Sequence, residues 1–126
     1  MNQYALKNPL ALAALGDAVI TMFVREDLIA NQDLPIAKIH SETAKIVNAK
    51  SQSIFFETIE DWLNDVEQDI ARRAINKKTN SIPKNATLAE YKKATAFEAV
   101  VGYLYITKNF YRLNQMMQHI AKSGEE

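Results

Sequence analysis

The chain has 126 residues, which suits one domain of ordinary size with enough length to bury a core. Hydrophobic residues make up 48% and charged residues 24%, the balance of a soluble globular protein rather than a disordered or membrane protein. The net charge is zero, which argues against a general nucleic-acid binder, and the absence of cysteine excludes disulfides, thiolate zinc sites and cysteine nucleophiles.

The first predicted element is a long helix from Pro9 to about Ala30. Asn8 precedes it as N-cap, and proline is favoured at the first helical position because its missing N–H would have no partner there. Gly16 lies in the middle, where glycine weakens a helix by up to ~1 kcal/mol. We therefore expect another backbone to approach closely at Gly16.

A turn after Asn31 leads into a second helix, which Pro35 opens. Apolar residues recur at helical spacing beyond it, and we expect this helix to continue as far as Leu63. Asp65 is predicted to cap a further helix that runs to Ile75.

The only predicted loop comprises residues 76–86, which are polar and rich in lysine. The pattern from Thr87 to Glu90 is a capping box, and it starts the helix that contains Glu98. Asn109 starts a final helix, and no strand, repeat or low-complexity segment is expected. The sequence therefore predicts an all-α fold, a single domain over residues 1–126 with five to seven helices.

Two solitary carboxylates lie inside apolar helical runs. Asp17 is the only charge in residues 9–24, and Glu98 is the only charge in residues 94–106. A carboxylate buried without a partner costs several kcal/mol, and neither run contains a Lys or Arg to pair with it. Either the two helices meet around a shared cation, or each carboxylate caps a neighbouring loop or meets a distant arginine. The pattern leaves both interpretations open.

The charges are unevenly distributed along the chain. Residues 53–71 contain six acids and no Lys or Arg, whereas residues 72–93 contain seven bases and one acid. The basic segment can form a cationic surface that holds phosphates. The alternative is a solvated helix end and loop with no ligand.

Other chemistry finds little support. There is no glycine-rich phosphate loop, and His40 and His119 are isolated histidines without metal-ligand spacing. The longest apolar stretch is interrupted by Asp17, and the N-terminus has no basic segment before a cleavable apolar stretch. We therefore expect no membrane span and no signal peptide, and a cytoplasmic location.

The motifs, in this order, resemble the ribonuclease III family. Residues 12–19 (Leu-Ala-Ala-Leu-Gly-Asp-Ala-Val) are similar to its signature helix, and residues 96–105 are similar to its second metal-binding helix. Three further segments, residues 40–52, 72–78 and 81–85, resemble the short bacterial Mini-III branch, which lacks a separate double-stranded-RNA-binding domain. The similarity covers essentially the whole chain.

The resemblance assigns the active site to two residues. Full-length family members carry further acids at the positions that here hold Leu10, Ala13 and Thr95, and the Mini-III branch shares this reduced set. Asp17 and Glu98 are therefore the implied catalytic and metal-binding residues. Mg²⁺ is the implied cofactor, since it accepts waters and phosphate oxygens beside two carboxylates.

The resemblance also implies a function. It predicts an endoribonuclease that hydrolyses double-stranded RNA with the help of Mg²⁺, leaving a 5′-phosphate and a 3′-hydroxyl. The implied substrate is the precursor of large-subunit (23S) ribosomal RNA, and whether a ribosomal protein on that substrate assists is left open. The implied RNA-binding residues are Arg72, Arg73, Lys77, Lys78 and Lys84, with Lys38, Lys45 and Lys50 as weaker candidates.

Family members work as homodimers whose interface includes the signature helix. Ala14, Ala18 and Met22 could pack in such an interface or equally in the core. Two alternative functions remain at this point: a catalytically silent ribonuclease III-like domain that binds RNA or ribosomes, and a non-enzymatic helical module whose carboxylates are caps.

Overall fold

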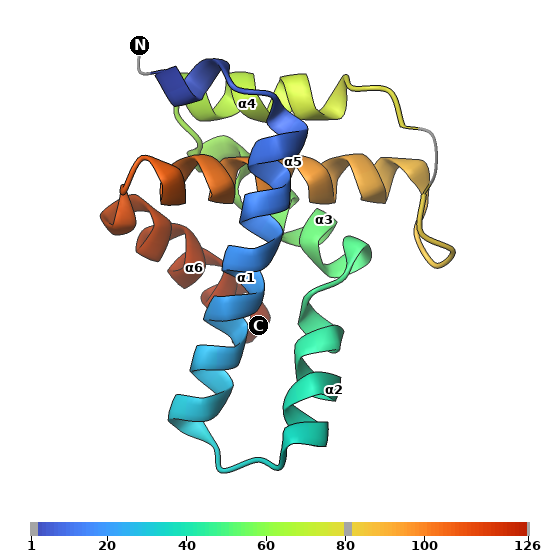
Figure 1. Cartoon of the computed structure of the whole chain (residues 1–126), viewed down its shortest axis with the longest axis vertical. Coiled ribbons are helices and arrows are strands. Elements are labelled where there is room, and N and C mark those ends of the chain that lie inside the picture. Colours follow the sequence, from blue (N-terminus) through green and yellow to red (C-terminus); the bar gives the residue numbers. More distant parts are fainter. Residues whose placement is uncertain (1–2, 80–81, 126) are drawn as a thin grey trace.

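The computed structural model describes residues 3–79 and 82–125, with side chains as far as residue 120. Within these ranges every regular element is helical, which confirms the predicted all-α class (Figure 1). The elements are η1 (Gln3–Leu6), α1 (Pro9–Asn31), α2 (Ile36–Ile46), α3 (Ala49–Ile59), η2 (Glu60–Trp62), α4 (Asp65–Ile75), α5 (Leu88–Ile106) and α6 (Phe110–Glu125).

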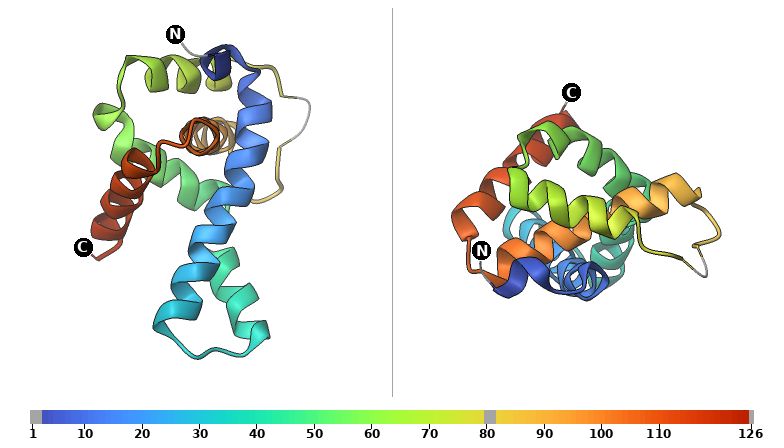
Figure 2. Two further views of the ribbon diagram at one scale, coloured as in Figure 1. Left: turned by 60° about the vertical axis from the view of Figure 1, so that its left-hand side comes forward. Right: turned by 90° about the horizontal axis from the view of Figure 1, so that it is seen from above.

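Helix α5 forms the centre of the fold. Phe97, Val100 and Leu104 on this helix are at most 1% exposed, and α1, α3 and α4 pack around it (Figures 1 and 2). A helix enclosed in this way is apolar on all sides. Glu98 is the exception within its apolar run, so the surroundings of this one side chain matter for function.

Helices α1 and α5 cross with their backbones in contact. A Cβ atom on Gly16 would lie 1.8 Å from the carbonyl oxygen of Glu98, and one on Gly102 would lie 1.9 Å from the carbonyl oxygen of Leu12. Only glycine, which has no Cβ, allows this approach. The expected close approach at Gly16 is confirmed, and it places the following residue, Asp17, beside Glu98.

The predicted second helix is in fact two helices, because Asn48 interrupts it. Its backbone is extended (φ −151°, ψ 162°), and its side chain accepts a hydrogen bond of 2.8 Å from the amide of Ser51. The side-chain nitrogen Nδ2 of Asn48 donates to the backbone carbonyls of Ala44 and Lys45 at 3.0 and 2.9 Å. The prediction of one continuous helix was wrong, since one asparagine side chain ends α2 and caps α3.

Helix α2 and the second half of α1 form a hairpin that projects from the rest of the fold (Figures 1 and 2). None of the helices in the described ranges is long and apolar enough to cross a membrane.

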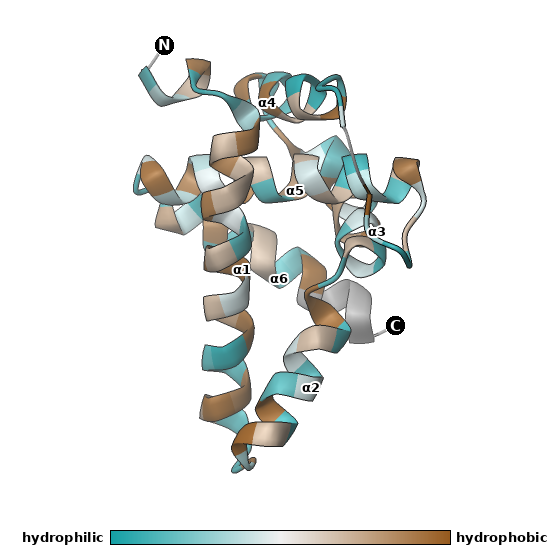
Figure 3. Ribbon diagram, turned by 45° about the vertical axis from the view of Figure 1, so that its right-hand side comes forward, coloured by the Kyte–Doolittle hydropathy of each residue, from teal (hydrophilic) through white to brown (hydrophobic). Residues whose placement is uncertain are grey.

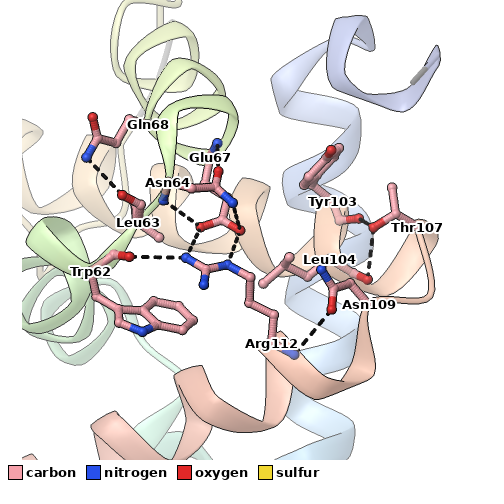
Figure 4. Close-up of polar contacts among 10 residues, drawn as sticks. All are labelled: Trp62, Leu63, Asn64, Glu67, Gln68, Tyr103, Leu104, Thr107, Asn109 and Arg112. Carbon is pink, nitrogen blue, oxygen red and sulfur yellow. Dashed lines mark hydrogen bonds and ion pairs between the residues drawn. The ribbon is translucent and has the colours of Figure 1, made fainter. Parts of the chain in front are cut away.

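A buried ion pair joins α4 to α6 (Figure 4). Glu67 is 1% exposed and accepts hydrogen bonds from Arg112 at 2.5 and 2.7 Å. The Arg112 guanidinium lies over the Trp62 ring, 3.8 Å from its centroid. Glu67 also completes a capping box with Asn64, so the cap of α4 is Asn64 and not Asp65 as predicted. This carboxylate is fully paired and therefore serves the fold.

Candidate active site

Asp17 and Glu98 line one small cavity, of about 180 Å³, between α1, α5, the start of α3 and the loop before α5. The glycine crossing of α1 and α5 brings the two residues together from positions 81 residues apart in the chain. Other polar residues of this cavity are Asn48, Gln52, Tyr91 and Thr95. The two carboxylates meet each other, and neither is the cap of a helix.

The two carboxylates differ in exposure. Glu98 is half-buried, but Asp17 is exposed in the single chain. The expectation that both acids are buried is therefore wrong for Asp17. The physical reason is the helical rotation of about 100° per residue: Gly16 faces α5 in the contact, and Asp17 points to the edge of that contact.

The environment keeps a proton on this pair. Burial is the largest cause that raises the pKa of Glu98 to about 8, and a hydrogen bond to Asp17 and the negative charge of Asp17 act in the same direction. At neutral pH the carboxyl group of Glu98 is therefore largely protonated and donates to Asp17. A divalent cation can replace this proton, because both groups are hard oxygen donors of the kind Mg²⁺ prefers.

The protein itself offers few ligands for such a cation. In the described part of the chain, no group of three or more His, Cys, Asp or Glu residues could hold a metal ion. Two carboxylates leave most of the six positions around Mg²⁺ to water and to oxygens of a substrate phosphate. The donor set fits a cation that binds together with its substrate.

We expect the metal-free protein to lose stability between about pH 5 and pH 8 because of Glu98. Its pKa is raised in the folded state above the ordinary 4.5, so the folded protein binds the extra proton in this window. The stabilising contribution is complete below the unfolded pKa and is lost as the pH passes the folded one. Thermal melting in EDTA across this range should show a steeper fall in Tm for the wild type than for Glu98→Gln. If Tm fell equally with pH in wild type and Glu98→Gln, the raised pKa of Glu98 would be contradicted.

The predicted RNA-binding lysines belong to the segment between α4 and α5. Lys84 lines a hollow together with Lys50 of α3, and this hollow shares Asn48 with the carboxylate cavity. Lys77 and Lys78 are exposed just after α4, where the chain leads into the same loop. Lys50, a weaker candidate from sequence, therefore lines a hollow next to the carboxylate cavity.

The two predicted arginines are placed differently. Arg72 is exposed and forms an ion pair with Asp69. Arg73 donates to Asp69 at 3.0 Å and to the carbonyls of Ala5 and Lys7, so it holds the N-terminal segment against α4. Neither arginine lines the carboxylate cavity. The basic segment of the sequence is thus divided between the site surroundings and the fold.

Sequence reasoning did not assign a role in the site to Asn48, Gln52 or Tyr91. The available signal was the helix-capping preference of Asn48 inside a helical pattern, which would have brought the start of α3 to attention. Gln52 lies one helical turn after Asn48 and enters the cavity for that reason.

Comparison with known proteins identifies the family. The model of the ribonuclease III domain matches residues 10–109. The chain belongs to the ribonuclease III family. The Mini-ribonuclease 3 of a Thermoanaerobacter species is 40% identical over 119 residues, 94% of this chain and 84% of that protein. The Mini-ribonuclease 3 of Staphylococcus aureus is 37% identical over 121 residues, covering 94% and 90%.

A solved structure has the same fold. The crystal structure of a protein from Fusobacterium nucleatum aligns with a TM-score of 0.85 and 32% identity, covering 96% of both chains. The resemblance to the Mini-III branch is confirmed, and so is the predicted class: this ribonuclease III domain is an endoribonuclease.

Proposed function

We propose that this ribonuclease III domain cleaves double-stranded RNA, with Asp17 and Glu98 as the catalytic and metal-binding residues. The supporting observation is the shared cavity, in which two carboxylates from separate helices are in contact. Bound there, Mg²⁺ would supply an activated water and neutralise charge on the phosphate oxygens. The backbone contact at Gly16 holds α1 against α5 and so keeps the two carboxylates close together.

The nucleophile is water. Its oxygen forms the new bond to phosphorus, the bond to the 3′-oxygen breaks, the water loses a proton to solvent and the 3′-oxygen takes one up. The products carry a 5′-phosphate and a 3′-hydroxyl. The hydroxyl group of Thr95 already donates to the carbonyl of Tyr91 at 2.9 Å, so it is not poised to attack.

A cleavage assay tests this function. An end-labelled RNA duplex is incubated with the protein, once with Mg²⁺ and once with EDTA. A third reaction contains Mg²⁺ and a DNA duplex of the same sequence. We expect cuts only in RNA with Mg²⁺. Binding of the RNA without cleavage under every divalent cation would instead support a catalytically silent domain.

The natural substrate that we propose is the precursor of 23S ribosomal RNA, processed in the cytoplasm, and the support is the resemblance to the Mini-III branch. Transcripts that carry the paired ends of this precursor should be cut at one position in each strand. An unrelated duplex of equal length is the control. Adding ribosomal proteins to the transcript shows whether one of them assists.

We also propose that the protein acts as a homodimer through α1. Ala14, Ala18 and Met22 are exposed in the single chain, so core packing of these residues is excluded. Met22 is 45% and Ile29 64% exposed, and both line an open hollow beside Ala18 on α1, with Arg25 and Glu26 at the same hollow. Hydrophobic segments recur along the ribbon of α1 (Figure 3). A second copy that packs this face symmetrically would bury it.

A mixed dimer of wild-type and Asp17→Asn subunits is expected to cut only one strand. The two sites of a symmetric dimer face the two antiparallel strands, so each site serves one strand. Tagged subunits purified as mixed dimers should yield nicked duplex, as seen by native and denaturing gels of the same sample. Cuts in both strands from a purified mixed dimer, or a monomer at micromolar concentration that cuts both strands, would contradict this arrangement.

Lys50 and the lysines of residues 77–84 are expected to set the salt dependence of RNA binding. Changing Lys50, Lys77, Lys78 and Lys84 to Ala should lower the slope of log affinity against log salt by about one for each phosphate that no longer meets a lysine. Affinity is measured with Ca²⁺ in place of Mg²⁺ to prevent cleavage. Arg72→Ala is measured separately, because Arg72 also belongs to the predicted RNA-binding set and its ion pair with Asp69 is exposed. An unchanged slope in the lysine variant would show a surface that does not contact RNA.

A further inference from the structure

Gln52 differs from the other buried polar side chains. It lies in the first turn of α3, is only 3% exposed, and lines the cavity that contains Asp17 and Glu98. So deep a position in the fold is unfavourable for an amide unless both of its ends find hydrogen-bond partners. The source of those partners therefore bears on the chemistry of the cavity.

The described part of the chain contains five buried polar or charged residues. The hydroxyl groups of Thr43, Ser53 and Thr95 each donate to a backbone carbonyl of their own or the preceding turn, at 2.6, 2.7 and 2.9 Å. Glu67 is paired with Arg112. Among the described residues, Gln52 makes no side-chain hydrogen bond, and its polar atoms are open to the cavity rather than sealed off. An amide left without a partner costs about 1–3 kcal/mol, so its partner is a water or a ligand in the cavity.

The surroundings of Gln52 favour an anion. The first turn of α3 has no acidic residue, so the positive end of the helix dipole is not neutralised there. Lys50 lies in the same turn and lines the adjoining hollow. The carboxylates of the cavity are suited to a cation, and a phosphate group bound beside such a cation would also lie next to the amide of Gln52 in this small space.

We propose that Gln52 contacts the scissile phosphate of the RNA, donating a hydrogen bond from Nε2 to a non-bridging oxygen. This inference rests on the proposed function. The oxygen gains negative charge as water attacks, so the bond is stronger in the transition state than in the bound substrate. The amide is neutral, so it donates this bond without changing its protonation state. No other side chain of the described residues forms a hydrogen bond with it.

The first experiment separates catalysis from binding and stability. The variant Gln52→Leu keeps a side chain of similar size and removes the oxygen and nitrogen of the amide. We expect the single-turnover cleavage rate at saturating protein to fall about 10²–10³-fold. RNA affinity in Ca²⁺ should change less than about threefold, and Tm should hold or rise because an amide with no protein partner is removed. Gln118→Leu, at an exposed position of α6, is the matched control.

A second experiment identifies the atom that is contacted. Sulfur replaces each non-bridging oxygen of the scissile phosphate in turn, and both RNAs are tested with wild type and Gln52→Leu. Sulfur accepts hydrogen bonds poorly, so the variant should lose much less rate than wild type on one of the two diastereomers. An RNA with 2′-deoxyribose at the scissile position tests the neighbouring hydroxyl in the same way.

Each outcome decides the proposal. A Gln52→Leu rate within about twofold of wild type overturns it, and so do additive sulfur effects in both diastereomers. Non-additivity only with the 2′-deoxy substrate assigns the contact to the ribose and overturns the phosphate contact. Gln52→Met is measured alongside in case the branched side chain packs badly. If wild type itself does not cut duplex RNA, the proposed function fails, and this result is distinct from all of the others.

Discussion

Asp17→Asn and Glu98→Gln are each expected to reduce cleavage of duplex RNA at least a thousandfold, equivalent to about 4 kcal/mol of transition-state stabilisation. The two carboxylates are the acidic residues of the cavity, and neither can hold a divalent cation as well alone. Single-turnover cleavage in Mg²⁺ measures the loss. Asp33→Asn, in the exposed turn between α1 and α2, is the control and should cut at the wild-type rate.

The same variants should keep the fold. Glu98→Gln removes a carboxyl group whose pKa is raised to about 8, mainly by burial, so above that pH it removes an unfavourable buried charge. In EDTA at alkaline pH its Tm should equal or exceed that of wild type. A stable variant without activity supports a site role. Near-wild-type cleavage by either variant would overturn the metal assignment, and a large fall in Tm would indicate a structural role instead.

Gly16→Ala is expected to destabilise the protein by about 3 kcal/mol or more, because the new Cβ would lie 1.8 Å from the Glu98 carbonyl oxygen. The obstacle is backbone, so α1 and α5 must separate. Helix propensity acts in the opposite direction, since alanine is favoured over glycine by up to ~1 kcal/mol. The clash therefore decides the sign. Cleavage should fall as well, because separation of the helices moves Asp17 away from Glu98.

Urea unfolding measures this effect. Ala11→Gly at an exposed position of the same helix isolates the propensity contribution and should cost no more than ~1 kcal/mol. Gly102→Ala tests the reciprocal contact with Leu12 and should resemble Gly16→Ala. A Gly16→Ala protein as stable as wild type, or more stable, would show that the two backbones do not meet as described.

Helix ends were predicted where their hydrogen bonds are local. Asn8 accepts from the amide of Leu10 at 3.0 Å, and the Thr87–Glu90 capping box forms as expected. Both patterns involve residues within three positions of each other, so the sequence contains all of the information. The break at Asn48 was missed because asparagine also occurs inside helices, so its capping preference alone does not separate a cap from a continuing helix, although the bonds that it forms to residues 44, 45 and 51 are local.

The role of each charged residue was also not predictable from the sequence alone. In the sequence Arg72, Arg73 and Lys84 all belong to one basic segment, but the fold directs Arg73 to the carbonyls of Ala5 and Lys7 and brings Lys84 beside the site. These partners lie more than sixty residues away from Arg73. Electrostatic patterns along a chain indicate an available charge, and tertiary contacts decide whether the fold already uses it.

By itself, the sequence determined the helical class, the close approach at Gly16 and the two solitary acids, because apolar periodicity, capping and isolated charges are properties of short segments. Only the tertiary structure decided that Asp17 and Glu98 share one cavity, that Asp17 stays exposed, and that Gln52 joins them. Those facts depend on how α1, α3 and α5 cross. A crossing is set by side-chain volumes and backbone contacts between distant residues, which no local pattern contains.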